Sequence, residues 1–185
     1  AELRLLLGSS IHSVLVAGLG NAAMTPDAIG PLSTGHVLVT RHLGEPPVFS
    51  ALTAVSVLTP GVLGRTGIEA LEIVRSAVRT VQPDALIVID ALASRSLSRL
   101  CTTVQLSDTG IVPGSGVGNH RCALDVLEEA GKPGIDPAAL RGHETVMVTT
   151  RDIDAQVSLL SRIVGYGIDL ALQPLSFAEI SALLG

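Results

Sequence analysis

Short apolar runs and longer amphipathic segments alternate along the chain. The short runs are rich in Val, Ile, Leu and Ala, which is typical of buried strands. The longer segments repeat apolar residues every three or four positions, as helices do. We therefore predict strands over residues 13–17, 54–58, 84–90 and 102–106, and helices over residues 27–43, 68–81, 121–130, 151–172 and 176–184.

The order of these elements predicts the fold class. Strands that alternate with helices favour a mainly parallel sheet with helices on both faces, that is, an α/β protein. The chain is 47% hydrophobic and only 16% charged, which suits strands buried on both faces. At 185 residues it fits a single domain over 1–185, in which residues 131–144, rich in Pro and Gly, form a possible linker or shortened insertion.

Composition narrows the classes of partner. The net charge of -5 argues against direct binding to nucleic acid, which needs a concentrated basic surface. No apolar run approaches the ~20 residues of a membrane span, so we expect a cytoplasmic protein without membrane contact. No two histidines have metal-ligand spacing, and we predict neither a metal nor another cofactor. Cys101 and Cys122 are interpreted as small buried side chains.

Two aspartates follow the ends of predicted strands. Asp27 lies in the run GLGNAAMTPDAIGPL after the first strand, and Asp90 ends the run DALIVID. Because the carboxyl ends of parallel strands share one edge, the two carboxylates can face each other across one cleft. One carboxyl would then keep a proton and act as an acid while the other activates water, as amide hydrolysis requires. Spacing alone favours structural roles, with Asp27 at a helix start and Asp90 capping a turn.

Several blocks of the sequence resemble the germination (spore) protease family, in the family's order. They are GLGN-AAM-TPDAIGPL, VTRHL, LTPGVLGRTGIEA, VIDALASRS and TTVQLSDTGIVPGSGVGN. The resemblance covers Val14 to about Arg121 and resumes near Val146 with VTTRDID and IVGYGIDLAL. It implies a three-layer α/β/α fold like that of hydrogenase maturation peptidases. It also implies that Asp27 and Asp90, in the TPDA and IDALA blocks, are the catalytic pair.

The resemblance sets expectations about activity as well. It implies an aspartate-dependent endopeptidase that degrades small acid-soluble spore proteins during germination, located in the spore core and assembled as a homo-oligomer. It further implies a zymogen with a short N-terminal propeptide. The sequence departs from the family between Arg121 and Val146, where the family has a further strand and a long insertion. This departure bears on the substrate cleft, the oligomer contacts and the final sheet edge.

Five further residues are candidates for supporting or substrate-binding roles. Asn21, Thr25 and Ser94 flank the two aspartates and can hydrogen-bond them, although each also suits a turn. Asp108 and Ser115 belong to the Gly-rich loop SDTGIVPGSGVGN. Backbone N–H groups of such a loop can hold a substrate carbonyl or an oxyanion. A plain glycine-rich connection is the alternative.

Three other functions remain open. A metal-dependent maturation-type peptidase would use the two aspartates as metal ligands, but the sequence offers no clear third ligand. A dinucleotide-binding enzyme would match Gly18, Gly20 and Ala23 as G-x-G-x-x-A, yet the acidic residue that this fingerprint requires after the second strand is missing. A catalytically inactive relative that only binds its partner is the non-enzymatic alternative.

Overall fold

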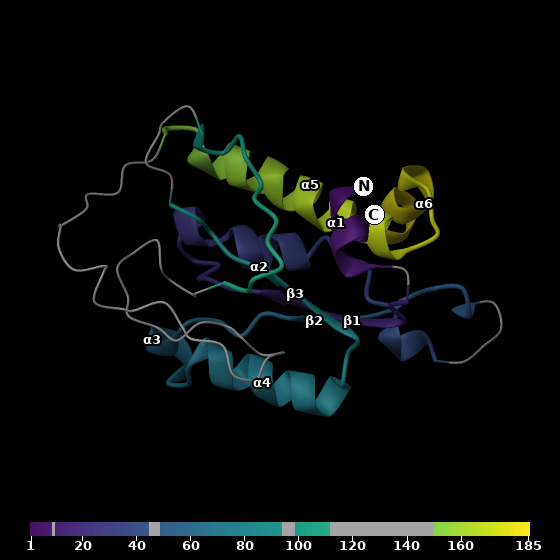
Figure 1. Cartoon of the computed structure of the whole chain (residues 1–185). Helices are drawn as coiled ribbons and strands as arrows, with labels where there is room; N and C mark the ends of the chain where they lie inside the picture. The colour runs from purple at the N-terminus through teal and green to yellow at the C-terminus, as the bar shows by residue number, and fades with distance from the viewer. Residues whose placement is uncertain (9, 45–48, 94–98, 112–149) are drawn as a thin grey trace.

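The computed structural model describes residues 1–8, 10–44, 49–93, 99–111 and 150–185 (Figure 1). Its strands are β1 (Ser13–Gly18), β2 (Ala54–Leu58) and β3 (Ala85–Ile89). Its helices are α1 (Glu2–Leu7), α2 (Ile29–Thr34), α3 (Leu63–Thr66), α4 (Ala70–Val81), α5 (Ile153–Leu172) and α6 (Phe177–Leu184). The 3-10 turns η1 (Thr25–Asp27) and η2 (Arg41–Leu43) lie between β1 and β2.

The three strands form one parallel sheet in the order β2-β1-β3. At the carboxyl edge Ala17 stands opposite Leu58 in β2, and Gly18 stands opposite Ile89 in β3. The central strand β1 is apolar along its length because both of its faces are covered, as is usual for a parallel sheet. The loops that follow β1 and β3 therefore begin side by side.

Helices cover both faces of the sheet (Figure 1). On one face α2 and α5 lie against the strands, and on the other lies α4. Alternate side chains of β1 point to opposite faces. Val14 and Val16 join the cluster that includes Ile168 of α5, whereas Ala17 joins the cluster that includes Val74 of α4. The predicted α/β fold class is confirmed.

Helices α2 and α5 approach each other closely at Gly165. A Cβ at this position would lie 2.6 Å from Cβ of His36 and 2.8 Å from the carbonyl oxygen of Ser33. The absence of a side chain therefore lets the two backbones pack together. Tyr166, the next residue, stacks on His36 with ring centroids 6.2 Å apart.

The start of the sheet and the last helix are fixed by side-chain caps. Asp84 precedes β3, and its Oδ2 accepts the backbone N–H groups of His12 and Ser13, each at 2.9 Å. These bonds align the amino ends of β1 and β3. Helix α6 starts with a capping box in which Ser176 and Glu179 each accept the other's backbone N–H.

The single helix predicted over residues 27–43 is wrong. The structure has the short helix α2, which ends at Thr34, and a turn and three residues without regular structure separate it from η2. The reason is a set of contacts distant in sequence. Leu38 donates its backbone N–H to Asp169, and Thr40 exchanges hydrogen bonds with Val55 of β2 instead of continuing a helix.

The strand predicted over residues 102–106 is also wrong. Residues 103–107 have no regular structure, and Val104 and Leu106 are 57% and 46% exposed, so the alternating pattern covers no core. Helices α1 and α3 were not predicted. The helix predicted over 121–130 and the possible linker 131–144 lie outside the described residues. Among the described helices, none combines the length and apolarity needed to cross a membrane.

Candidate functional site

The carboxyl edge of β1 and β3 carries both predicted catalytic aspartates. Asp27 is the last residue of η1 in the loop after β1, and Asp90 is the first residue after β3. The two loops are joined where they begin, because Leu19 donates its N–H to the carbonyl oxygen of Ile89 at 2.8 Å. Both aspartates are half-buried. The structure thus brings the two carboxylates to neighbouring strand ends, as predicted from the parallel order.

The loop from Asn21 to Asp27 closes on itself and holds the Asp27 carboxylate. The backbone N–H of Asn21 donates to Oδ2 of Asp27 at 2.8 Å, and the N–H of Asp27 donates to the carbonyl oxygen of Met24 at 2.8 Å. The side chain of Asn21 turns to its own loop, where Oδ1 accepts the N–H of Ala23 at 3.0 Å. Within the described residues, no hydrogen bond reaches Oδ1 of Asp27, so one carboxylate oxygen is held and the other is unbonded.

Two glycines let this loop and α2 lie against the strand ends. Gly20 has φ 114°, and a Cβ there would lie 2.1 Å from the carbonyl oxygen of Asp27. At Gly30, the second residue of α2, a Cβ would lie 2.2 Å from the carbonyl oxygen of Leu19 and 2.7 Å from that of Ile89. Only residues without a side chain fit these approaches. The Asp27 turn is therefore packed against the residues that follow β1, and the first turn of α2 is packed against the residues at the ends of β1 and β3.

The same packing argues against the dinucleotide-binding alternative. In that motif the second glycine leaves room for a pyrophosphate to approach the backbone. Here the space beside Gly20 is filled by the backbone and carboxylate of Asp27. The glycines serve the aspartate loop.

The Asp90 carboxylate accepts a hydrogen bond from the residue that follows it. Its Oδ1 accepts the N–H of Ala91 at 2.9 Å. Each of the two aspartates thus accepts a backbone N–H from a residue of its own loop. A carboxylate oriented in this way is also what a catalytic pair requires, because its oxygens must be aimed before substrate arrives.

The supporting candidates have different outcomes. Asn21 contacts Asp27, but through its backbone N–H. Thr25 does not bond either aspartate of the pair among the described residues; its hydroxyl donates to Asp154 of α5 at 2.6 Å. Asp108 is exposed in a bend, and no hydrogen bond joins it to Asp27 in the described ranges. Ser94 and Ser115 lie outside the described residues.

Asp154 is a residue that sequence reasoning missed. It lies in the first turn of α5, 129 residues from Thr25, and only the packing of α5 beside η1 brings the two together. The available signal was an acidic residue in the first turn of a long helix, within the block TTRDID. That signal alone indicates a helix start and not a contact.

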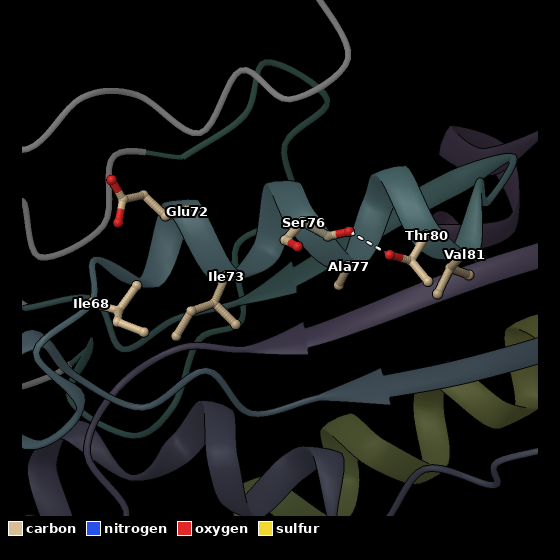
Figure 2. Close-up of a pocket in the computed structure, with 7 residues that line it drawn as sticks. All are labelled: Ile68, Glu72, Ile73, Ser76, Ala77, Thr80 and Val81. Carbon is tan, nitrogen blue, oxygen red and sulfur yellow. Dashed lines mark hydrogen bonds between the residues drawn. The ribbon is translucent and has the colours of Figure 1, made fainter.

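Two further features of the described residues bear on chemistry, a cysteine and a groove. Cys101 is half-buried and free, and burial, together with the charge of Asp152, raises the pKa of its thiol. No three His, Cys, Asp or Glu side chains gather into a group that could hold a metal within the part of the chain that the structure describes. A shallow groove follows α4 (Figure 2) and includes neither aspartate; it is lined by Ile68, Glu72, Ile73, Ser76, Ala77, Thr80 and Val81.

Comparisons with known proteins point to one family. A family model described as germination protease matches residues 6–139. A germination protease of Caldanaerobacter subterraneus subsp. tengcongensis is 47% identical over 156 residues, which cover 78% of this chain and 48% of that protein. A germination protease of Clostridium perfringens strain SM101 is 36% identical over 218 residues, covering 88% of this chain and 66% of that protein.

A third relative matches more of this chain than the first two do. The germination protease of Clostridium acetobutylicum is 33% identical over 226 residues, which cover 93% of this chain and 69% of that protein. The chain therefore spans about half to two thirds of the length of these relatives.

Proposed function

The chain belongs to the germination protease family, and from this premise we propose that it is an endopeptidase of spore germination with Asp27 and Asp90 as its catalytic pair. Small acid-soluble spore proteins are the proposed substrates. The proposed setting is the spore core, where the chain would form a homo-oligomer and be made as a zymogen.

The observation that carries the proposal is the direct pairing of β1 with β3. Asp90 follows Ile89, and Ile89 accepts the N–H of Leu19 in the loop that leads to Asp27. The first turn of α2 sits on both strand ends through Gly30. These contacts support a shared cleft for the two carboxylates at the carboxyl edge, which is where open α/β sheets commonly bind ligands.

The proposed chemistry divides the work between the two carboxyl groups. Two neighbouring carboxylates do not ionise together easily, so one retains its proton. The ionised partner takes a proton from water as the water oxygen bonds to the peptide carbonyl carbon. The protonated partner gives its proton to the departing amide nitrogen as the C–N bond breaks. We assign neither role to one residue, because the proposed mechanism needs only that one carboxyl group of the pair carries the proton.

A metal-dependent peptidase and an inactive binding relative are the competing proposals. The first would use the same two aspartates as ligands and is separated by its response to a chelator. The second predicts binding of spore protein without cleavage. The experiment below distinguishes all three.

The test is cleavage of a purified small acid-soluble spore protein by the purified chain, followed by gel and mass spectrometry. The variants are Asp27→Asn and Asp90→Asn, each assayed with and without EDTA. Asp84→Asn is the matched control, because Asp84 precedes β3 at the opposite edge of the sheet from Asp90. Circular dichroism at the assay temperature confirms that every variant is folded.

We expect cleavage by the parent chain and by Asp84→Asn, and a loss of at least about 100-fold in each catalytic variant. Insensitivity to EDTA supports the metal-free mechanism, whereas loss in EDTA and recovery with added metal supports the metal-dependent one. Binding without cleavage by the folded parent chain would overturn the enzymatic proposal. Full activity in either Asp27→Asn or Asp90→Asn would overturn the assignment of the pair.

A further inference from the structure

The turn that carries Asp27 is held from two sides. On the sheet side, Asn21 donates its backbone N–H to the Asp27 carboxylate. On the helix side, the hydroxyl of Thr25 donates to Oδ1 of Asp154 at 2.6 Å. The second contact joins residues 129 positions apart and is made by the side chains alone. It fastens the turn to a different layer of the fold.

We propose that Asp154 is a positioning residue that fixes the Asp27 turn through Thr25, an inference that rests on the proposed function. Asp154 does not itself act on substrate in this proposal. Its carboxylate sets where η1 lies relative to α5, and so where the Asp27 carboxylate is aimed.

The geometry of the bond suits this role. An O–H···O⁻ distance of 2.6 Å falls in the range of charge-assisted hydrogen bonds, which are shorter and stronger than neutral ones. Asp154 lies in the first turn of α5, where unpaired backbone N–H groups favour a negative charge. Pro26 follows Thr25 and restricts the backbone of the turn. A constraint at Thr25 is therefore passed on to Asp27 two residues later.

Helix α5 is itself held in place in the fold, so its hydrogen bond to Thr25 can fix the position of η1. It has 20 residues, and its interior is anchored to the segment after α2 by Gly165 and Asp169. Because the anchoring points lie on the same helix as Asp154, a shift of η1 relative to α5 must break the Thr25 hydrogen bond. Misplacement of a catalytic group by about 1 Å can lower a rate by about 100-fold.

The variants that test the inference are Asp154→Ala, Thr25→Val and their combination. Asp154→Asn and Thr25→Ser are the conservative variants, because each keeps an oxygen able to make the bond. Asp152→Ala is the matched control: Asp152 lies two residues earlier at the same helix end, but its Oδ2 accepts from Gln156 at 2.6 Å. The readouts are kcat and KM for the spore protein, the pH profile of kcat, and amide hydrogen exchange.

We expect Asp154→Ala and Thr25→Val each to lower kcat by about 10- to 100-fold with little change in KM. The double variant should lose no more than the worse single one, because both remove the same contact. Asp154→Asn, Thr25→Ser and Asp152→Ala should stay within about threefold of the parent. The shape of the pH profile should not change, since Asp154 transfers no proton. Loss of one limb of the profile in Asp154→Asn would instead make it an acid or base and overturn the positioning role.

Hydrogen exchange decides the inference separately from catalysis. The N–H of Asp27, bonded to Met24, and that of Ala28, bonded to Thr25, report on the turn. Both should exchange about 10-fold faster in Asp154→Ala and Thr25→Val, and unchanged in Asp152→Ala. Unchanged exchange in all variants would overturn the inference even if the chain is a peptidase. Faster exchange in these variants of a chain that cleaves nothing would support a structural role for the Thr25–Asp154 hydrogen bond while the proposed function fails. Faster exchange with an unchanged kcat would overturn the positioning role.

Discussion

The carboxylate of Asp169 is fully buried in α5 and accepts the backbone N–H of Leu38 through Oδ1 at 2.9 Å and Oδ2 at 3.1 Å. This contact directs the chain after α2 toward β2. It also has an electrostatic cost, because burial raises the pKa of Asp169 to about 6 while the N–H of Leu38 partly opposes the rise.

Replacing Asp169 should therefore change how stability depends on pH. The folded protein holds the proton of the Asp169 carboxyl group more tightly than the unfolded chain does. The contribution of Asp169 to the stability of the fold therefore becomes less favourable as pH rises from about 4 to about 6. Asp169→Asn removes this term and keeps an oxygen for Leu38. We expect the free energy of unfolding of Asp169→Asn, relative to that of the parent, to rise by up to about 3 kcal/mol between pH 4 and pH 7. Urea unfolding of both proteins at the two pH values measures the difference, and an equal difference at both would contradict it.

Asp84 should show the opposite dependence. Its hydrogen bonds from the N–H groups of His12 and Ser13 lower the pKa of the carboxyl from 3.8. A lowered pKa gives stability that is present at neutral pH and is lost as pH falls below about 4. We expect Asp84→Asn to be less stable than the parent at pH 7, with the difference shrinking at pH 3. The exposed residue Asp108 supplies the control, because Asp108→Asn should change stability little at either pH.

Local pattern was enough to predict the elements that bury a regular face. The strands β1, β2 and β3 and the helices α4 and α5 lie close to the predicted ranges because each has a clear period. The secondary-structure predictions failed where contacts between residues far apart in sequence determine the local structure. Leu38 is drawn out of a helix by Asp169, 131 residues away, which no local pattern contains.

The candidate site divides in the same way. The placement of Asp27 and Asp90 at the carboxyl edge of the sheet follows from two strand ends and the rule for parallel sheets, so it could be predicted from the sequence. The hydrogen bond from Thr25 to Asp154 could not, because it depends on where α5 packs. The group of Asn21 that bonds Asp27 could not be predicted either, because an asparagine in a loop gives no sign of whether its backbone or its side chain will bond.

Two glycines in α5 should respond in opposite ways to the same substitution. Gly165→Ala would place its Cβ 2.6 Å from Cβ of His36, so α2 and α5 must separate. We expect the free energy of unfolding to fall by about 1–3 kcal/mol. Gly167 has nothing within 4 Å of the position of a Cβ. Gly167→Ala should instead raise the free energy of unfolding by about 0.5–1 kcal/mol, because alanine has a higher helix propensity than glycine. Urea unfolding of both variants checks the pair, and equal effects would contradict the close packing of the two helices.

Gly20→Ala should disturb the Asp27 loop more than backbone strain alone can explain. Gly20 and Gly8 both have positive φ, 114° and 78°. A Cβ at Gly8 meets nothing within 4 Å, whereas one at Gly20 would lie 2.1 Å from the carbonyl oxygen of Asp27. We therefore expect Gly8→Ala to cost about 1 kcal/mol, from strain, and Gly20→Ala to cost about 2 kcal/mol more, because the loop must open.

The same substitution tests whether the loop geometry matters for the proposed chemistry. Opening the loop at Gly20 should break the hydrogen bond from Asn21 to Asp27, which appears as a shifted Asn21 amide resonance and faster exchange of that N–H. The rate of spore protein cleavage should fall by about 10-fold or more in Gly20→Ala even where the variant is fully folded, because the Asp27 carboxylate is no longer held in its orientation. Gly8→Ala, which lies before the amino end of β1 and so away from the carboxyl edge of the sheet, should cleave like the parent. Equal stability and equal cleavage in the two variants would show that Gly20 is not required for the approach of the loop to the strand ends.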